Sequence, residues 1–304
     1  MIISASYRTD IPAFYGRWFL NRLRAGYCRT INAFNGRPSD VALGPGSVDA
    51  FVFWTRNFEP LFPDLDLICG RAPFVVQFTV TGYPRALETS VVLPERAVGQ
   101  IQQLSARFGP KVPVWRYDPI VVSSLTSPEW HLENFRRLAA ELRGHVDEVV
   151  ISFVQVYRKT LRNLDAAAAR RHFEWRDPGE DEKRELVRRL VDIAADHGMT
   201  LAICSQPQFS GGGAHEARCI DAHRLSDVAG RPIGAIEKGN RPGCRCAQSR
   251  DIGAYDTCPH GCAYCYAVEN RNLAVRRFRA HDPDSPFLFA PEKVLAAQEL
   301  PKLI

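Results

Sequence analysis

Strand-like runs alternate with helix-like runs along residues 1–205, and this alternation constrains the fold more than any other feature of the sequence. The strand-like runs are rich in branched and aromatic residues and cover 2–8, 50–56, 74–81, 112–118, 148–156 and 200–205. Helical patterns lie between them at 12–25, 94–108, 128–143 and 180–197. Such alternation predicts a parallel sheet with helices outside it, either an open doubly wound sheet or a full or partial barrel.

Polar side chains favour the barrel, because they stand two residues apart at the ends of several strand-like runs. They are Ser4, Ser6, Arg8, Gln77, Thr79, Arg116 and Asp118. A period of two places each set on one side of its strand, and the strand ends of a parallel barrel converge on one mouth that holds the active site. The sequence therefore predicts an α/β fold with a full or partial parallel (β/α) barrel of the TIM type. Solvated loop starts are the alternative interpretation of the same residues.

The charged residues at this expected mouth are the candidate catalytic residues Arg8, Asp10, Arg116 and Asp118. Arg8 and Asp10 follow the first strand, where they are suited to bind a substrate carboxylate or to move a proton. Asp10 is equally suited to cap a helix that begins at Pro12. Arg116 and Asp118 are suited to pair with each other or to face a substrate.

The composition changes at Gln206, from where glycine, proline, cysteine and arginine dominate. We expect residues 1–205 to form the barrel-like core and residues 206–304 to form a cysteine-rich extension packed on it, within one structural domain. A chain of this length buries roughly 75% of its unfolded surface, so it does not need metal or disulfides to fold. Any metal is therefore expected to serve function.

Five of the nine cysteines fall between Cys244 and Cys265, and the centre of this group is the sequence Cys-Pro-His-Gly-Cys-Ala-Tyr-Cys at 258–265. Three thiolates with C-x3-C-x2-C spacing can take three corners of a 4Fe-4S cluster and leave one iron without a protein ligand. Gly261 lets such a loop turn tightly, and Tyr264 places an aromatic ring beside the cluster. His260 is expected to form a hydrogen bond beside the cluster instead of ligating it.

This spacing, with an aromatic residue just before the last cysteine, resembles the signature of radical S-adenosylmethionine (SAM) enzymes. The resemblance implies that Cys258, Cys262 and Cys265 hold a 4Fe-4S cluster whose fourth iron binds SAM. It also implies a parallel barrel and an electron donor such as flavodoxin or ferredoxin. In that superfamily the motif normally follows the first barrel strand, whereas here it lies near the end of the chain. The candidates for binding SAM are Tyr264 and the glycine run Gly211, Gly212 and Gly213.

A second resemblance covers nearly the full length. The segments at 2–6, 8–15, 52–57, 115–119 and 251–258 resemble an uncharacterised bacterial domain family with a C-terminal cysteine motif. This resemblance implies that the chain forms a single domain, and it implies no reaction or substrate.

The other cysteines of the C-terminal half are candidates for a second iron-sulfur cluster or a tetrahedral zinc site: Cys204, Cys219, Cys244 and Cys246. His215 and His223 flank Cys219 and are suited to join a zinc site. The alternative is that these cysteines are packed or loop thiols. Cys28 and Cys69 are expected in the core, and His131 is expected at the surface.

The lead hypothesis is a cytoplasmic radical SAM-type enzyme that acts on a small-molecule or nucleotide-like substrate. No secretion signal opens the chain, and its longest uncharged apolar stretch, 72–84, is too short and polar to span a bilayer. The main alternative is a zinc- or iron-sulfur-stabilised module that binds nucleic acid or protein. The net charge of +5 is well short of a dedicated nucleic-acid binder. A third hypothesis is a metal-independent hydrolase that uses Asp10 or Asp118.

Overall fold

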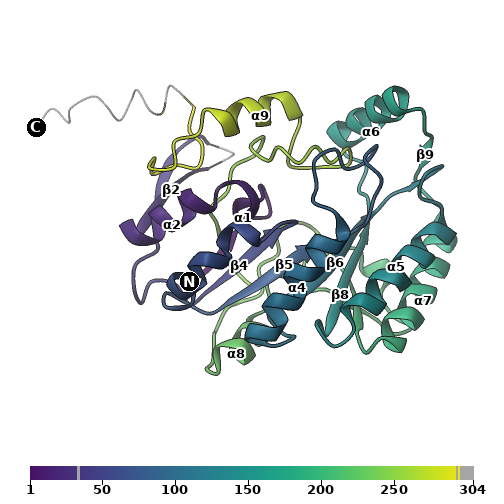
Figure 1. The fold of residues 1–304 in the computed structure, drawn as a ribbon, viewed down its shortest axis with the longest axis horizontal. Coiled ribbons are helices and arrows are strands. Elements are labelled where there is room, and N and C mark those ends of the chain that lie inside the picture. Colours follow the sequence, from purple (N-terminus) through teal and green to yellow (C-terminus); the bar gives the residue numbers. More distant parts are fainter. Residues whose placement is uncertain (33–34, 292–293, 295–304) are drawn as a thin grey trace, which may run out of the picture.

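The computed structural model describes residues 1–32, 35–291 and 294, and it is built around one parallel sheet (Figure 1). All the strand-like runs form strands of this sheet. The strands are, in sheet order, β12 (Arg250–Asp251), β1 (Ile2–Ala5), β4 (Ala50–Thr55), β5 (Phe74–Thr79), β6 (Pro113–Ile120), β8 (Glu148–Phe153), β10 (Thr200–Ile203) and β11 (Ala214–Glu216).

The strands follow one another in chain order from β1 to β11, as they do in a barrel. The exception is β12, which returns from the cysteine-rich region and pairs in parallel with β1, Ser4 beside Asp251. In the described chain the edge strands β11 and β12 do not pair with each other. The α/β class is therefore confirmed, whereas a closed barrel is not.

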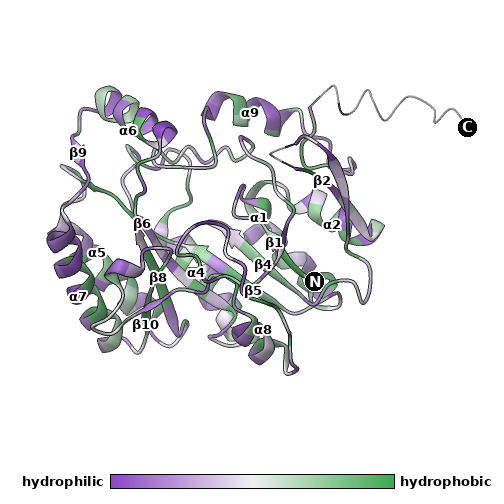
Figure 2. Cartoon of the chain, turned by 180° about the vertical axis from the view of Figure 1, so that it is seen from behind, coloured by the Kyte–Doolittle hydropathy of each residue, from purple (hydrophilic) through white to green (hydrophobic). Residues whose placement is uncertain are grey.

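Helices α2 (Gly16–Ala25), α4 (Pro94–Phe108), α5 (Pro128–Leu142) and α7 (Glu180–Asp196) cover one face of the sheet. Each of these helices is amphipathic, with hydrophobic residues on the side that faces the sheet and polar residues on the other side. The mixed colours of α5 and α7 in Figure 2 show both kinds of residue. Phe19 of α2 packs edge-on against Phe51 and Phe53 of β4. The expected helix at 12–25 is divided at Tyr15, since α1 (Ile11–Phe14) precedes α2.

The opposite face of the sheet is covered by the cysteine-rich region. Val52, Val75 and Val114 pack there against Leu225 of α8 (Ala222–Ala229) and its flanking segments. Toward the carboxyl ends of the strands the same face turns polar, and Gln77 donates a hydrogen bond to the carbonyl of Cys219. Of the expected mouth residues, Gln77, Arg116 and Asp118 meet there through hydrogen bonds, although the sheet stays open.

Several elements carry no strong pattern in the sequence. They are the hairpin β2 (Tyr27–Ile31) and β3 (Pro38–Ala42), α3 (Leu65–Cys69), α6 (Arg158–Arg171), α9 (Arg271–Arg279), the 3-10 turns η1 (Glu59–Asp64) and η2 (Pro207–Phe209), and the short pair β7 (Val122–Ser123) and β9 (Trp175–Arg176). In both views α6 and α9 lie along the upper edge of the molecule and α8 at its lower edge (Figures 1 and 2).

Two burial predictions are wrong. Cys69 is exposed, because it ends α3, while Cys28 is buried as expected. His131 is fully buried on the sheet-facing side of α5, in line with Phe135 and Leu138. Within the described chain, none of the helices combines the length and the apolarity that a membrane crossing requires.

Candidate functional site

The cysteine loop, residues 258–265, forms one wall of a cavity of about 670 Å³. Cys258, Cys262 and Cys265 all line this cavity and are half-buried. Its other walls are α6, the first residues of α9 and the loop after β5. The expected turn at Gly261 is present, with a φ of +77°. A Cβ atom there would meet Nε of Arg271 at 2.4 Å, so only glycine fits without displacement.

Backbone hydrogen bonds hold the cysteine loop against the segment after β5. The amide of Ala263 donates to the carbonyl of Leu87 at 2.9 Å, and the amide of Ser90 donates to the carbonyl of His260 at 2.9 Å. Glu88 and Cys262 form an isolated antiparallel bridge between these bonds. The loop is therefore attached as a short strand-like segment, although it carries no regular secondary structure of its own.

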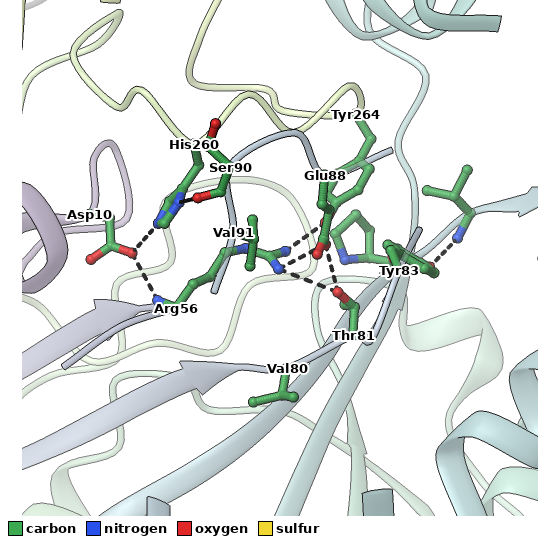
Figure 3. Close-up of polar contacts among 12 residues, drawn as sticks. Asp10, Arg56, Val80, Thr81, Tyr83, Glu88, Ser90, Val91, His260 and Tyr264 are labelled. Carbon is green, nitrogen blue, oxygen red and sulfur yellow. Dashed lines mark hydrogen bonds and ion pairs between the residues drawn. The ribbon is translucent and has the colours of Figure 1, made fainter. Parts of the chain in front are cut away.

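A buried charged network joins the loop to the carboxyl ends of β4 and β5 (Figure 3). Nη1 of Arg56 lies 2.8 Å from Oε1 of Glu88, and Nη2 donates to the hydroxyl of Tyr264 at 2.6 Å. Tyr264 donates in turn to Glu88, and Thr81 donates to the same carboxylate at 2.6 Å. Burial opposes the charge of Arg56, but Glu88 and Tyr264 hold the pKa of Arg56 well above its usual value.

Asp10 also attaches the cysteine loop to the sheet, through His260. Its side chain caps α1 by accepting from the amide of Ala13 at 3.0 Å, as one interpretation of the sequence predicts. The same carboxylate accepts from the hydroxyl of Thr55 at 2.6 Å and from the amide of Arg56 at 2.8 Å. It also lies 2.8 Å from Nε2 of His260, inside the cysteine loop. Asp10 therefore couples the first helix, the end of β4 and the loop.

A second cavity, of about 380 Å³, lies at the polar carboxyl end of the sheet, and we name it the mouth cavity. Arg116 and Asp118 line it as a paired unit, with Nε of Arg116 donating to Oδ1 of Asp118 at 3.0 Å. The guanidinium also lies over the ring of Trp54, 5.0 Å from its centroid. Tyr264 lines the mouth cavity while its neighbours Cys262 and Cys265 line the cysteine cavity, so the loop separates the two.

The four remaining candidate ligands also line the mouth cavity: Cys204, Cys219, Cys244 and Cys246. Sγ of Cys219 donates to Sγ of Cys204 at 3.6 Å, and all four are free thiols. His215 and His223 are exposed and do not belong to the described lining of this cavity.

The other candidate residues lie outside the cysteine cavity. Arg8 is half-buried, stacks over Tyr7 and Tyr255, and lies 3.7 Å from the buried carboxylate of Asp251. The glycines 211–213 all have positive φ and lie in the turn before β11. Among the described residues that line the cysteine cavity, none is one of these glycines, so their binding of SAM stays a prediction.

Neither Glu88 nor Arg56 is singled out in the sequence analysis. Glu88 lies in an irregular segment between β5 and α4, where a single acidic residue carries no periodic signal. Arg56 is the last residue of the strand-like run at 50–56, a position like that of Arg8 in the first run. Only the three-dimensional arrangement shows that Arg56 and Glu88 are buried together beneath the cysteine loop.

The fold and the site define a parallel α/β protein whose C-terminal three-cysteine loop lies over the carboxyl edge of the sheet. The model of a domain family described as "domain of unknown function (DUF1848)" matches residues 2–267. The chain belongs to this family, which confirms the full-length resemblance to an uncharacterised domain family. The matched range includes Cys258, Cys262 and Cys265. A search of curated proteins found no match.

Proposed function

We propose that Cys258, Cys262 and Cys265 hold a 4Fe-4S cluster and that the protein is a radical SAM-type enzyme. The observation that supports this proposal is that three thiols of one short loop line a single cavity, and that this cavity is large enough for a small molecule such as SAM. In the described chain no three His, Cys, Asp or Glu side chains surround one ion-sized point. A cluster does not require this, because each thiolate ligates a different iron.

The loop would leave the fourth iron of such a cluster open. The side chain within the loop best suited to ligate it is His260, but its Nε2 donates to Asp10 at 2.8 Å and its Nδ1 lies 3.5 Å from the carbonyl of Ser90. Both ring nitrogens therefore already face oxygen atoms. A vacant iron is the feature that distinguishes a cluster that binds SAM from one that only transfers electrons.

The cysteine cavity suits SAM in size and a thiolate-bound cluster in charge. Its volume of about 670 Å³ lies within the range of small-molecule sites. Arg162, Arg170, Arg171 and Arg271 line it against a single lining carboxylate, Glu269. This positive excess offsets the negative charge of the three thiolates. A bound cluster supplies the electron for reductive cleavage of the SAM sulfonium, which starts radical chemistry on the substrate.

The residues of this chain orient the cofactor and keep water out. Arg56, Glu88 and Tyr264 fix the loop through buried hydrogen bonds, and the ring of Tyr264 closes the side that faces the mouth cavity. We place a small-molecule or nucleotide-like substrate beside SAM in the cysteine cavity, where a radical formed on SAM can reach it directly, and assign the electron to a flavodoxin or ferredoxin. The sequential strand order supports a partial barrel as the frame of this site.

The direct test is release of 5'-deoxyadenosine by anaerobically reconstituted protein supplied with SAM and dithionite. We expect Cys258→Ala to reduce release to background, because the cluster loses a ligand. Cys69→Ala is the matched control, since this thiol is exposed at the end of α3, and it should leave release unchanged. No deoxyadenosine from wild-type protein with verified cluster iron and sulfide would refute the proposal. Zinc in place of iron would favour a binding module.

A further inference from the structure

We propose that Cys204, Cys219, Cys244 and Cys246 form a second, structural metal site for one zinc ion in the mouth cavity. The four thiols come from three separate segments. Cys204 follows β10, Cys219 precedes α8, and the other two lie in the loop before β12. The fold gathers them at one cavity, distinct from the one lined by the cysteine loop. This inference does not rest on the proposed radical SAM function.

Hydrogen-bond donors point at these sulfur atoms. Nη1 of Arg116 lies 3.0 Å from Sγ of Cys219, and Nη2 of Arg241 lies 3.4 Å from Sγ of Cys204. The amide of Ile220 donates to Sγ of Cys246 at 3.4 Å. Donors to the ligating sulfur are the usual outer partners of metal-bound thiolates. If Cys204 and Cys219 were only packing in the core, neither thiol would require a guanidinium group beside its sulfur.

The charges around the cavity also balance. Four thiolates around a divalent ion leave a net charge of −2. Among the described residues that line the cavity, the charged ones are Arg116, Lys159 and Arg241 against Asp118, which sum to +2. The sum is a neutral site, which avoids the cost of an uncompensated charge around the buried thiols.

The spacing of the sulfurs favours one ion over a second cluster. Tetrahedral zinc with bonds of about 2.3 Å separates its sulfurs by about 3.8 Å. The distance of 3.6 Å between Sγ of Cys204 and Sγ of Cys219 is close to this sulfur–sulfur separation. It is also far longer than a disulfide bond of about 2.05 Å. In a cluster each sulfur binds its own iron, so the sulfurs stand further apart.

Closure of the site requires side-chain rotation. In the described chain no three such ligands already surround one point. Cys204, Cys219 and Cys246 are buried, whereas Cys244 is half-buried on the loop that follows Arg241. At least two of the four side chains must therefore turn, and Cys244 is the one with most freedom to do so. The bound ion would join β10, the segment before α8 and the segment before β12, and thereby fix the cysteine-rich region to the sheet.

The test is elemental analysis of the full-length protein purified anaerobically, for zinc, iron and acid-labile sulfide. We expect about one zinc per chain in the wild type, lost in Cys219→Ser and in Cys246→Ser without loss of iron. Cys262→Ser should show the converse, lost iron with retained zinc. Cys69→Ser is the control that keeps both. Failure of the radical SAM proposal would change only the iron, so the two outcomes are distinguishable.

A measurement on the unmodified protein covers the case in which these variants do not fold. X-ray absorption at the zinc edge should show four sulfur ligands at about 2.3 Å. Wild-type protein without zinc, zinc bound by nitrogen or oxygen, or zinc that disappears with Cys262→Ser would each overturn the assignment. Iron lost from Cys219→Ser in a protein that holds no zinc would overturn it as well.

Discussion

Glu88 holds the buried charge of Arg56 beneath the cysteine loop, and this pair sets the stability of the site at the scale of single residues. Glu88→Gln leaves the guanidinium buried without an anionic partner. We expect the free energy of unfolding to fall by about 3–5 kcal/mol, measured by denaturant titration. Glu59→Gln is the matched control, because the Arg96–Glu59 pair is exposed, and it should cost less than about 1 kcal/mol. Equal losses in the two variants would contradict this account.

His131 gives the protein a specific sensitivity to acid. Burial lowers the pKa of His131 to about 4 from 6.5, so the native protein holds the ring neutral. The unfolded chain takes up this proton first, and stability therefore falls as the pH drops from about 6.5 to about 4, by about 3 kcal/mol in full.

The measurement is the free energy of unfolding against pH for wild type and His131→Gln. The variant loses the bonds to Tyr117 and Val121 and is less stable at neutral pH, but its curve should be flatter across this interval. An identical slope for the two proteins would refute the assignment to His131.

Sequence reasoning at this scale succeeds where one residue has one local partner. The cap formed by Asp10 depends only on the start of a helix, and this was predicted. The bond from His260 to the same carboxylate joins positions far apart in the chain, and no local pattern encodes it. The burial of His131 was missed because an imidazole reads as polar, although its position on α5 falls on the apolar stripe.

At the scale of elements, the shape of the cysteine loop depends on Gly261. Gly261→Ala adds a Cβ atom 2.4 Å from Nε of Arg271 at a φ of +77°, so the loop or Arg271 must move. We expect the iron content after anaerobic reconstitution to fall, because the three thiols share this loop. Gly198→Ala separates backbone strain from the clash with Arg271. Gly198 has a similar φ of +75°, but no atom lies within 4 Å of the added carbon.

The control variant should lose about 1–2 kcal/mol of stability from backbone strain alone and keep its iron. Full iron retention in Gly261→Ala would show that the loop geometry is not required for the cluster.

Elements with a strong period were predicted well, and short elements were not. The runs at 50–56 and 74–81 became β4 and β5, because both faces of these strands are buried and their sequences are mostly apolar. β12 has only two residues, Arg250 and Asp251, and neither favours a strand. It forms because Ser4 and Ser6 of the first segment both donate to the Asp251 carboxylate at 2.8 Å. Long-range contacts of this kind are not visible in a single sequence.

At the scale of the whole molecule, the cysteine-rich region is part of the main sheet. It supplies β11 and β12 at opposite edges of the sheet, and its helix α8 packs on the face opposite to α2, α4, α5 and α7. We therefore expect a single unfolding transition by circular dichroism and by fluorescence of Trp18 and Trp115, both fully buried. Two separated transitions, with the C-terminal region unfolding first, would contradict this arrangement.

The central claim is that three thiolates leave one iron vacant for SAM. The most direct measurement is the electron paramagnetic resonance spectrum of the reduced, reconstituted protein before and after addition of SAM. The account predicts a cluster signal that changes when SAM binds, and no such signal in Cys262→Ala. A cluster spectrum that stays the same at saturating SAM would show that the fourth iron is closed and would contradict the claim.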